Sequence, residues 1–221
     1  MIVPAFDEER ELPLVLDHLA GLEGRWEVLV ADGGSRDQTP QIARERGLQL
    51  VAQGATRAEQ LNAAVRAAEG DVLLFLHADS RLPPGAYPAL ASALRDPRVA
   101  GGNFALRFDG GDRFARILTG AYSLQRRFGF YSGDSSVWVR RQEFERLGGF
   151  RPLPIMDDYD FVRRLESSAQ TRCLPGPALT SSRRWRAIGT PRTLMAWWII
   201  RLLFVAGVPP QRLAGLYARV R

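Results

Sequence analysis

The sequence predicts an α/β fold: a mostly parallel sheet flanked by helices, with antiparallel elements in the carboxyl half and helices at the C-terminus. Segments with strand-like and helix-like patterns alternate over the first 80 residues. The run "LLFL" (73–76) is apolar throughout, which is typical of a strand buried on both faces of a helix-covered parallel sheet. The length of 221 residues and the content of 46% hydrophobic and 24% charged residues fit a single globular domain.

The amino half contains four predicted strands, separated by three predicted helices. Its helices show apolar residues at spacings of three and four, as in Leu12, Val15, Leu16 and Leu19. Pro40 lies in the first turn of the second helix and Gly47 ends it. The strands are predicted at 2–3, 26–32, 48–52 and 71–79, and the helices at 12–19, 39–47 and 61–70.

The carboxyl half breaks this alternation. A short helix is predicted at 83–96, and the segment 99–110 places Phe104, Leu106 and Phe108 on one face of an antiparallel strand. A helical or mobile excursion follows at 112–130, a further strand at 135–141, and a helix that begins near Asp157. The sequence shows no internal repeat and no low-complexity linker, which favours one domain over residues 1–221.

Charge and cysteine content exclude several function classes. The net charge is +6 and all 30 basic residues are arginines, spread along the chain without a nucleic-acid-binding motif, so we predict no nucleic-acid partner. Cys173 is the single cysteine, which excludes an internal disulfide and fits a reducing compartment. The N-terminus "MIVPAF" lacks a basic leader, so a cytoplasmic protein is expected.

The segment 193–208, "TLMAWWIIRLLFVAGV", is apolar almost all round. It is short for a membrane span of about 20 residues and contains Arg201. We favour a helix buried against the core. The alternative is an interfacial helix with Trp197 and Trp198 at headgroup level, and with Arg192, Arg201 and Arg212 facing anionic lipid at the inner face of the membrane.

Two carboxylates follow predicted strands. Asp32 precedes two glycines that would let a ligand approach closely, although an Asp-Gly-Gly turn also forms for structural reasons alone. Asp79 follows the fourth strand, where it is either a helix cap or a ligand of Mg²⁺ or Mn²⁺ beside a diphosphate. His77 is either a second metal ligand or a buried neutral histidine. Ligands of parallel sheets bind at these strand ends.

Asp157, Asp158 and Asp160 open a helix, where acidic residues complement the helix dipole. Asp158 falls on the same face as Phe161, Val162 and Leu165. A carboxylate on an apolar face is costly unless it lines a cleft. Desolvation in a cleft raises a carboxyl pKa, which suits a general base, so Asp158 is a candidate for that role.

Five segments in order resemble the family 2 glycosyltransferases of the GT-A fold, a Rossmann-like fold, over roughly residues 2–185. The "P-A-Y-N-E"-like stretch appears as "PAFDE" (4–8), and the "V-D-D-G-S-x-D-G-T" turn as "ADGGSRDQT" (31–39). The helix with Arg57 and Asn62 ends in "AEGD" (68–71), and the D-x-D motif appears as "HAD" (77–79). The segment "GGFRPLPIMDDYDFVRRL" (148–165) matches the family's "G-G-F … E-D-x-D" segment.

The resemblance implies an inverting, metal-assisted transfer of a sugar from a nucleoside-diphosphate donor to an acceptor hydroxyl, on a lipid-linked or a small-molecule acceptor. It implies Asp158 as the general base and Mn²⁺ or Mg²⁺ held by Asp79, with His77 as a second candidate ligand. The implied donor-binding residues are Pro4, Phe6, Glu8, Asp32, Arg57, Asn62 and Asp79. The implied acceptor or sugar contacts are Asp134, Gly149, Asp157, Arg184 and Trp185, with Asn103, Arg107 and Tyr131 as further specificity candidates.

On this reading residues 1–80 are the nucleotide-binding half, 81–185 the acceptor and catalytic half, and 186–221 an apolar helical segment. The chain departs from the family pattern at His77, which replaces the first acid of D-x-D, and at Gly33, which replaces the second acid of the first motif. "SSRRW" (181–185) lacks the Gln of the processive Q-x-x-R-W motif, which argues against polymer synthesis. The size, the "HAD" variant and the C-terminal segment resemble a bacterial subgroup sometimes named for arsenosugar biosynthesis.

Three other classes stay open from the sequence. A non-catalytic nucleotide-sugar-binding or scaffold protein would share the fold. A nucleotidyltransferase usually needs a Gly-rich basic first loop, whereas "PAFDEERELP" (4–13) is acidic and has no glycine. A glycoside hydrolase needs paired carboxylates across the scissile bond and no nucleotide.

Overall fold

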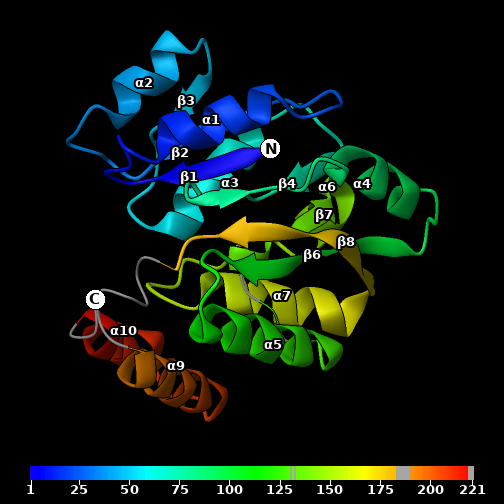
Figure 1. Cartoon of the computed structure of the whole chain (residues 1–221). Coiled ribbons are helices and arrows are strands. Elements are labelled where there is room, and N and C mark those ends of the chain that lie inside the picture. The colour runs from blue at the N-terminus through cyan, green and yellow to red at the C-terminus, as the bar shows by residue number, and fades with distance from the viewer. Residues whose placement is uncertain (130, 132, 183–189, 219–221) are drawn as a thin grey trace.

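The computed structural model describes residues 1–129, 131, 133–182 and 190–218. Its strands are β1 (Ile2–Ala5), β2 (Leu29–Asp32), β3 (Gln49–Val51), β4 (Val72–Leu74), β5 (Ser80–Arg81), β6 (Val99–Phe108), β7 (Trp138–Arg140) and β8 (Gln170–Thr180). Its helices are α1 (Leu12–Ala20), α2 (Thr39–Glu45), α3 (Arg57–Ala67), α4 (Ala86–Leu94), α5 (Arg113–Arg127), the 3₁₀ turn η1 (Gly133–Ser135), α6 (Arg141–Arg146), α7 (Asp157–Ser168), α9 (Thr190–Val205) and α10 (Pro210–Ala218). Figure 1 shows α1, α2 and β1–β3 at one end of the molecule, and α5, α9 and α10 at the other.

The amino half is a parallel sheet in the order β1-β2-β3, as the alternating pattern predicts. β4 joins this sheet only through a parallel bridge between Ile2 and Phe75, where the Leu76 N–H donates to the Ile2 carbonyl at 3.0 Å. On its other side β4 pairs antiparallel with β7. The predicted fourth strand is therefore too long: it ends near Phe75, and a turn closed by the Ser80 N–H and the His77 carbonyl follows.

The carboxyl half is a mixed sheet in the order β4-β7-β6-β8-β5. β6 pairs antiparallel with β7, as predicted, and parallel with β8. β8 was not predicted from the sequence, because the Pro175-Gly176-Pro177 stretch looks like a chain break. The stretch bulges out instead: Phe104 pairs with Leu174, and Leu106 pairs with Ala178.

Phe104, Leu106 and Phe108 of β6, which we expected to share one face, pack in two different clusters. Phe104 packs in the core cluster that contains residues of α1 and α4. Leu106 and Phe108 pack instead with Ala115 and Leu118 of α5.

Local signals account for most helix boundaries. Thr56 and Glu59 form a reciprocal capping box that starts α3 at Arg57. Asp112 caps α5 through the Ala115 N–H, which settles the 112–130 excursion as helix over Arg113–Arg127. Burial of the apolar residues between the sheet and the helices holds the amino and carboxyl halves together, as in the cluster that joins Ile2, Phe75 and Phe161.

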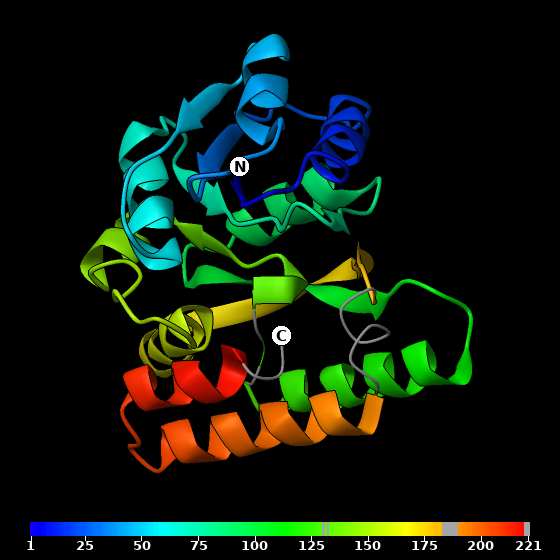
Figure 2. The same cartoon turned by 90° about the vertical axis from the view of Figure 1, so that its left-hand side faces the viewer.

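We expected the apolar C-terminal helix to be buried against the core, but only one of its sides packs against the protein. α9 contacts the protein through Trp197, Ile200 and Phe204. Its opposite side exposes Leu202 at 63% and Val205 at 67%. Figure 2 shows α9 running beside α5 along one side of the molecule, where only one side of the helix faces the protein. Among the described residues, no helix combines the length and the apolar character that crossing a membrane requires.

Candidate active site

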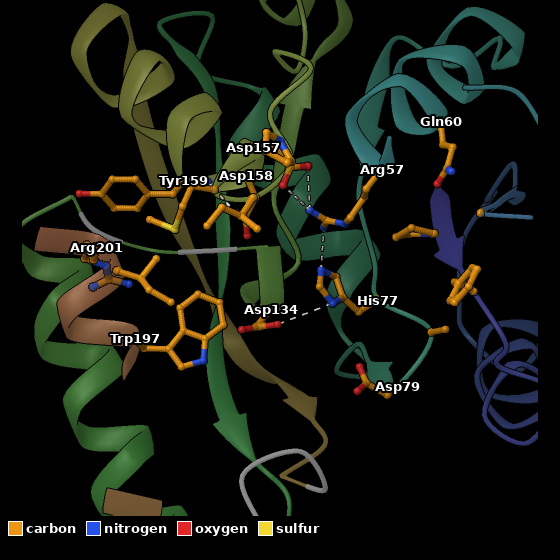
Figure 3. Close-up of a pocket in the computed structure, with 18 of the residues that line it drawn as sticks. Arg57, Gln60, His77, Asp79, Asp134, Asp157, Asp158, Tyr159, Trp197 and Arg201 are labelled. Carbon is orange, nitrogen blue, oxygen red and sulfur yellow. Dashed lines mark hydrogen bonds and ion pairs between the residues drawn. The ribbon is translucent and has the colours of Figure 1, made fainter. Parts of the chain in front are cut away.

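A cavity of about 410 Å³ lies where the carboxyl ends of β1 and β4 meet the amino end of α7. Its walls come from four parts of the chain: the segment after β1, the start of α3, the turn after β4, and the segment 154–159. Figure 3 shows that α9 forms a further wall through Trp197 and Arg201, opposite Arg57 and Gln60. Cavities at the carboxyl ends of parallel strands are the usual ligand sites of such sheets.

Arg57 is the centre of the polar network in this cavity. As the first residue of α3, it reaches across the site, and its Nη1 donates to both carboxylate oxygens of Asp157 at 3.1 and 2.9 Å. Its Nη2 lies 3.0 Å from His77 Nε2. Burial alone lowers the pKa of Arg57, but the nearby carboxylates of Asp157, Asp158 and Asp134 outweigh it and raise that pKa.

The contact with Arg57 fixes the proton on the ring of His77. A guanidinium has donors only, so His77 Nε2 accepts this hydrogen bond and is unprotonated. The ring proton of the neutral imidazole is therefore on Nδ1, which lies 3.6 Å from Asp134 Oδ1 (Figure 3). A metal bound at Nε2 would have to displace the guanidinium. In this geometry His77 links Arg57 and Asp134, and its role as a metal ligand stays a prediction.

The first turn of α7 presents two adjacent carboxylates in different settings. Asp157 is 6% exposed, and burial raises its pKa against the opposing charge of Arg57. Asp158 is half-buried, lines the cavity, and accepts a 2.8 Å hydrogen bond from the Tyr159 N–H at Oδ1. As the sequence predicts, Asp158 lies in a cleft, and its neighbour Asp157 is the more buried carboxylate. Met156, with φ of 63°, is in the left-handed region just before the helix.

The segment after β1 lines the cavity with Pro4, Phe6 and Glu8. The 33–39 loop holds it in place: the Glu8 N–H donates to Thr39 Oγ1 at 2.8 Å. Gly33 has a steric reason to lack a side chain, because a Cβ there would lie 3.0 Å from the Phe6 ring. The small residue that departs from the family motif makes room for this aromatic side chain.

Asp32 does not line the cavity. It is 4% exposed, and its carboxylate accepts hydrogen bonds from the backbone N–H groups of Gly34 and Ser35 at 3.1 to 3.3 Å. These bonds close the turn after β2. Asp32 thus closes this turn, which is the structural alternative considered from the sequence, and its contact with a donor stays a prediction.

Asn62 and Gly149 are also outside the cavity lining, although the resemblance implied ligand contacts for both. The Asn62 amide donates to the Phe150 carbonyl at 2.8 Å and accepts from the Phe150 N–H at 3.0 Å. Gly149 has φ of 67°, and a Cβ there would lie 2.7 Å from Asn62 Oδ1. Together they fasten α3 to the segment that leads into α7, and so they position Arg57 relative to Asp157.

The predicted specificity residues between positions 103 and 134 also fall into two groups, those that line the cavity and those that do not. Asp134 lines the cavity, whereas Asn103, Arg107 and Tyr131 do not. Asn103 and Tyr131 are buried, and the Asn103 amide donates to the Phe104 carbonyl at 2.7 Å. Burial raises the pKa of the Tyr131 hydroxyl well above its usual value. Arg184 and Trp185 lie outside the described residues.

Asp79 is the carboxylate that suits a divalent cation here. It lines the cavity in the turn after β4, as the sequence predicts. In the part of the chain that the structure describes, no group of three or more His, Cys, Asp and Glu side chains is placed to hold a metal. Mg²⁺ and Mn²⁺ are commonly held by one or two carboxylates together with phosphate oxygens and water. The donor set fits a cation that a bound diphosphate helps to hold.

Sequence reasoning missed the contribution of the C-terminal helix to this cavity. Trp197, Trp198, Ile200 and Arg201 of α9 line it, as do Tyr122 and Gln125 of α5. Arg201 Nη1 donates to Gln125 Oε1 at 2.7 Å and so joins the two helices. The paired tryptophans next to an arginine were the available signal, but nothing in the sequence shows which part of the fold an apolar helix will cover.

Comparison with known proteins identifies the family. The family model described as "Glycosyl transferase family 2" matches residues 1–157, more than half of the chain. The chain belongs to glycosyl transferase family 2. Its arrangement of strands, helices and cavity is the GT-A fold, as the sequence resemblance implied.

Two curated relatives and one solved structure illustrate the match. The β-monoglucosyldiacylglycerol synthase of Synechocystis sp. is 26% identical over 189 residues, which covers 75% of this chain and 39% of that protein. The undecaprenyl-phosphate 4-deoxy-4-formamido-L-arabinose transferase of Aeromonas hydrophila is 30% identical over 105 residues, 42% of this chain and 32% of that protein. The mannosyltransferase PcManGT of Pyrobaculum calidifontis, solved with GDP-Man and Mn²⁺, has a TM-score of 0.65 at 22% identity, covering 99% of this chain and 68% of that chain. The chain thus spans a third to two fifths of the length of these curated relatives.

Proposed function

We propose that the chain transfers a sugar from a nucleoside-diphosphate donor to an acceptor hydroxyl, with inversion at the anomeric carbon. The observation that carries the proposal is one cavity that gathers a guanidinium, Arg57, and two separate carboxylates, Asp79 and Asp158, at strand and helix ends. The family supports the reaction class. In this proposal residues 1–80 bind the nucleotide and residues 81–185 bind the acceptor and perform the chemistry.

The donor binds against the ends of β1 and β4. Phe6 offers an aromatic surface to the base, and Arg57 offers positive charge to the diphosphate. Asp157 and His77 hold the Arg57 guanidinium from two sides, so its direction is fixed before the donor arrives. A charged group that is already oriented does not have to reorganise during the reaction, which is the basis of electrostatic preorganisation.

Asp158 is the better general base of the two adjacent carboxylates. Both oxygens of Asp157 accept hydrogen bonds from Arg57, so a proton added there would compete with the guanidinium. Asp158 lines the cavity from the same helix turn. The acceptor hydroxyl gives its proton to an Asp158 oxygen as its own oxygen forms a bond to the anomeric carbon. The bond from that carbon to the diphosphate oxygen breaks on the opposite face, and the nucleoside diphosphate leaves with the electron pair.

Asp79 is the proposed protein ligand for Mn²⁺ or Mg²⁺. When bound with the diphosphate, the cation supplies positive charge that offsets the charge on the leaving group. The neighbour of known structure from Pyrobaculum calidifontis was solved with Mn²⁺, which supports this metal class. His77 has no metal role in the proposal, since its Nε2 accepts from Arg57.

The proposed acceptor is lipid-linked. Both curated relatives described above have names that include a lipid, a diacylglycerol in one and undecaprenyl phosphate in the other. The acceptor side of the cavity also has apolar walls, from Trp197, Trp198 and Ile200 of α9. A small-molecule acceptor is the second outcome of an acceptor screen. The cytoplasmic location expected from the single cysteine stays a prediction.

A thermal-shift panel tests donor binding. Nucleoside diphosphates and their sugars, with and without Mn²⁺, are added to the wild type and to the Asp79→Ala and Asp158→Asn variants. We expect one nucleotide with Mn²⁺ to raise the melting temperature of the wild type and of Asp158→Asn, but not of Asp79→Ala. Absence of a shift with every nucleotide would refute donor binding.

A transfer assay with the same two variants tests catalysis. Loss of turnover in Asp158→Asn with donor binding intact separates a transferase from a nucleotide-sugar-binding scaffold. A general base contributes roughly 10²–10⁴-fold, so the expected loss is of that order. Full turnover in Asp158→Asn would rule out this residue as the base.

A further inference from the structure

α5 and α9 lie side by side, and each exposes several large apolar side chains. Ile117 and Leu124 of α5 and its C-cap residue Phe128 are exposed, and their spacing of seven and four residues places them on one stripe. On α9, Trp198, Ile199, Leu202 and Val205 are exposed and also share one stripe. Trp198 also reaches the edge of the cavity, whereas the other residues of the two stripes are absent from its lining. Figure 2 shows the two helices side by side on the same side of the molecule. We call these two stripes the α5–α9 face.

The charge of these helices has one sign. α5 contains four arginines, α9 two and α10 one, and none of the three helices contains Asp or Glu. Arg116 and Arg127 are exposed and lie eleven residues apart, so they form a row beside the apolar stripe of α5. Arg113 is exposed on the same flank, and Arg212 is exposed on α10.

Exposed apolar side chains in this number mark an interaction surface. A helix with apolar residues on one side and arginines beside them lies in the headgroup region of a membrane, where the apolar side enters the acyl boundary and the cations meet anionic lipid. Trp198 is about half exposed on the stripe, and tryptophan is the residue most typical of that boundary.

We propose that the α5–α9 face binds the surface of an anionic lipid bilayer. The absence of acidic residues in all three helices decides between a bilayer and a second copy of this chain. Two copies facing each other would bring their arginine rows together without a carboxylate from these helices to offset them, whereas an anionic bilayer complements both the charge and the apolar side chains.

This surface adjoins the cavity. Trp197 and Arg201 point inward from α9 to line the cavity, while Leu202 and Val205 point outward (Figure 3 shows the inward pair). A bilayer at the α5–α9 face would therefore lie directly behind the acceptor wall. The docking proposal rests on the surface alone and does not depend on the proposed sugar transfer, because vesicle binding is measured without donor or acceptor.

The test is flotation of the whole chain with two kinds of vesicle, pure phosphatidylcholine and a mixture of phosphatidylcholine with phosphatidylglycerol. We expect the wild type to float with the mixed vesicles and much less with the neutral ones, and the binding to weaken as salt is added. The partition coefficient of the Arg116→Glu/Arg127→Glu variant onto the mixed vesicles should be at least roughly tenfold lower than that of the wild type, since each cation near an anionic surface adds to the attraction. Its matched control is Arg44→Glu/Arg95→Glu, which makes the same charge change at exposed positions of α2 and at the end of α4.

A second pair of variants tests the apolar part. Leu202→Ser removes an outward side chain of α9 and should reduce flotation severalfold, whereas Leu14→Ser, at an exposed position of α1, should not. Both positions are at least half exposed, so unchanged melting temperatures are expected and confirm that the variants fold.

Three outcomes overturn the proposal: no flotation of the wild type with mixed vesicles, equal losses in test and control variants, or a dimer in light scattering that Leu202→Ser converts to monomer. The last result would assign the face to a second copy. Failure of flotation with normal nucleotide binding would refute this inference and leave the proposed function standing.

Discussion

Replacing Asn62 by alanine distinguishes a structural role from a donor-binding role. The family resemblance implies a donor contact, whereas the structure shows the Asn62 side chain bonded twice to the Phe150 backbone, at 2.8 and 3.0 Å. Phe150 is 4% exposed, so water reaches its backbone groups poorly once the amide is gone. The variant should therefore lose stability, and the nucleotide affinity at a temperature where it stays folded should change little.

The magnitude follows from these two bonds. Each of the two hydrogen bonds contributes about 1 kcal/mol net, and an unpaired buried donor adds about 1–3 kcal/mol of desolvation cost, so the free energy of unfolding should fall by about 3–5 kcal/mol. For a domain of this size about 1 kcal/mol corresponds to 2–4 °C, which gives a melting temperature lowered by about 6–20 °C.

The assay is urea unfolding followed by fluorescence, with a nucleotide titration alongside. The matched control is Gln41→Ala, which removes an exposed amide that makes one 2.7 Å bond to Glu45 within α2, and should cost under about 0.5 kcal/mol. An unchanged melting temperature together with a lost nucleotide titration would refute the reasoning and return Asn62 to the donor site.

Three further predictions concern different parts of the molecule. His77→Ala should reduce turnover, because the Arg57 guanidinium loses a hydrogen-bond partner, but should leave the Mn²⁺ concentration for half-maximal activity unchanged. Asp79→Ala should raise that concentration. A raised Mn²⁺ concentration for half-maximal activity in His77→Ala would show that the histidine is a metal ligand. Phe161→Ala should lower the free energy of unfolding by about 3–5 kcal/mol, because a fully buried ring that packs 4.8 Å from the ring of Phe150 is lost; a loss near zero would show that the site collapses around the gap. Cys173 is exposed, so iodoacetamide reaches it, but the protein around the sulfur desolvates the thiol and raises its pKa, which leaves less thiolate at pH 8. Its reaction should therefore be slower than that of a free thiol at pH 8 and should become faster at higher pH; a rate equal to that of free cysteine would contradict this.

Controls for these predictions come from the same chain. Phe6→Ala is the control for Phe161→Ala. Because the Phe6 side chain is 54% exposed, this variant should change the free energy of unfolding by under about 0.5 kcal/mol, which shows that burial of the ring, and not the loss of any aromatic ring, causes the effect. For the thiol, the charge of Arg126 opposes the effect of burial, so Arg126→Ala should raise the pKa of Cys173 further and slow the reaction again.

Short-range patterns were enough to predict much of the fold. The helical spacing at 12–19, the Pro40 and Gly47 signals and the apolar run at 73–76 predicted α1, α2 and β4, because a residue's preference for helix, strand or turn depends mostly on its neighbours in the chain. β8 was missed because Pro175 and Pro177 look like a break, and only the pairing with β6 shows that the chain bulges and continues. Which cluster Phe104, Leu106 and Phe108 join is likewise decided by the helices packed on each part of β6.

The sequence by itself determined the family, the fold class and which residue types gather at the strand ends: Asp79, Asp158 and Arg57 were named from motif and pattern, and all three line the cavity. Only the tertiary structure decided how these residues are used. His77 Nε2 lies within hydrogen-bond distance of Arg57, Asp157 is the more buried of the two adjacent carboxylates, and the Asn62 side chain bonds to the backbone of Phe150. α9 covers one wall of the cavity and exposes its other side. The physical reason is that hydrogen bonds and burial depend on distances between segments far apart in the chain, such as residues 57 and 157, and no local pattern contains those distances.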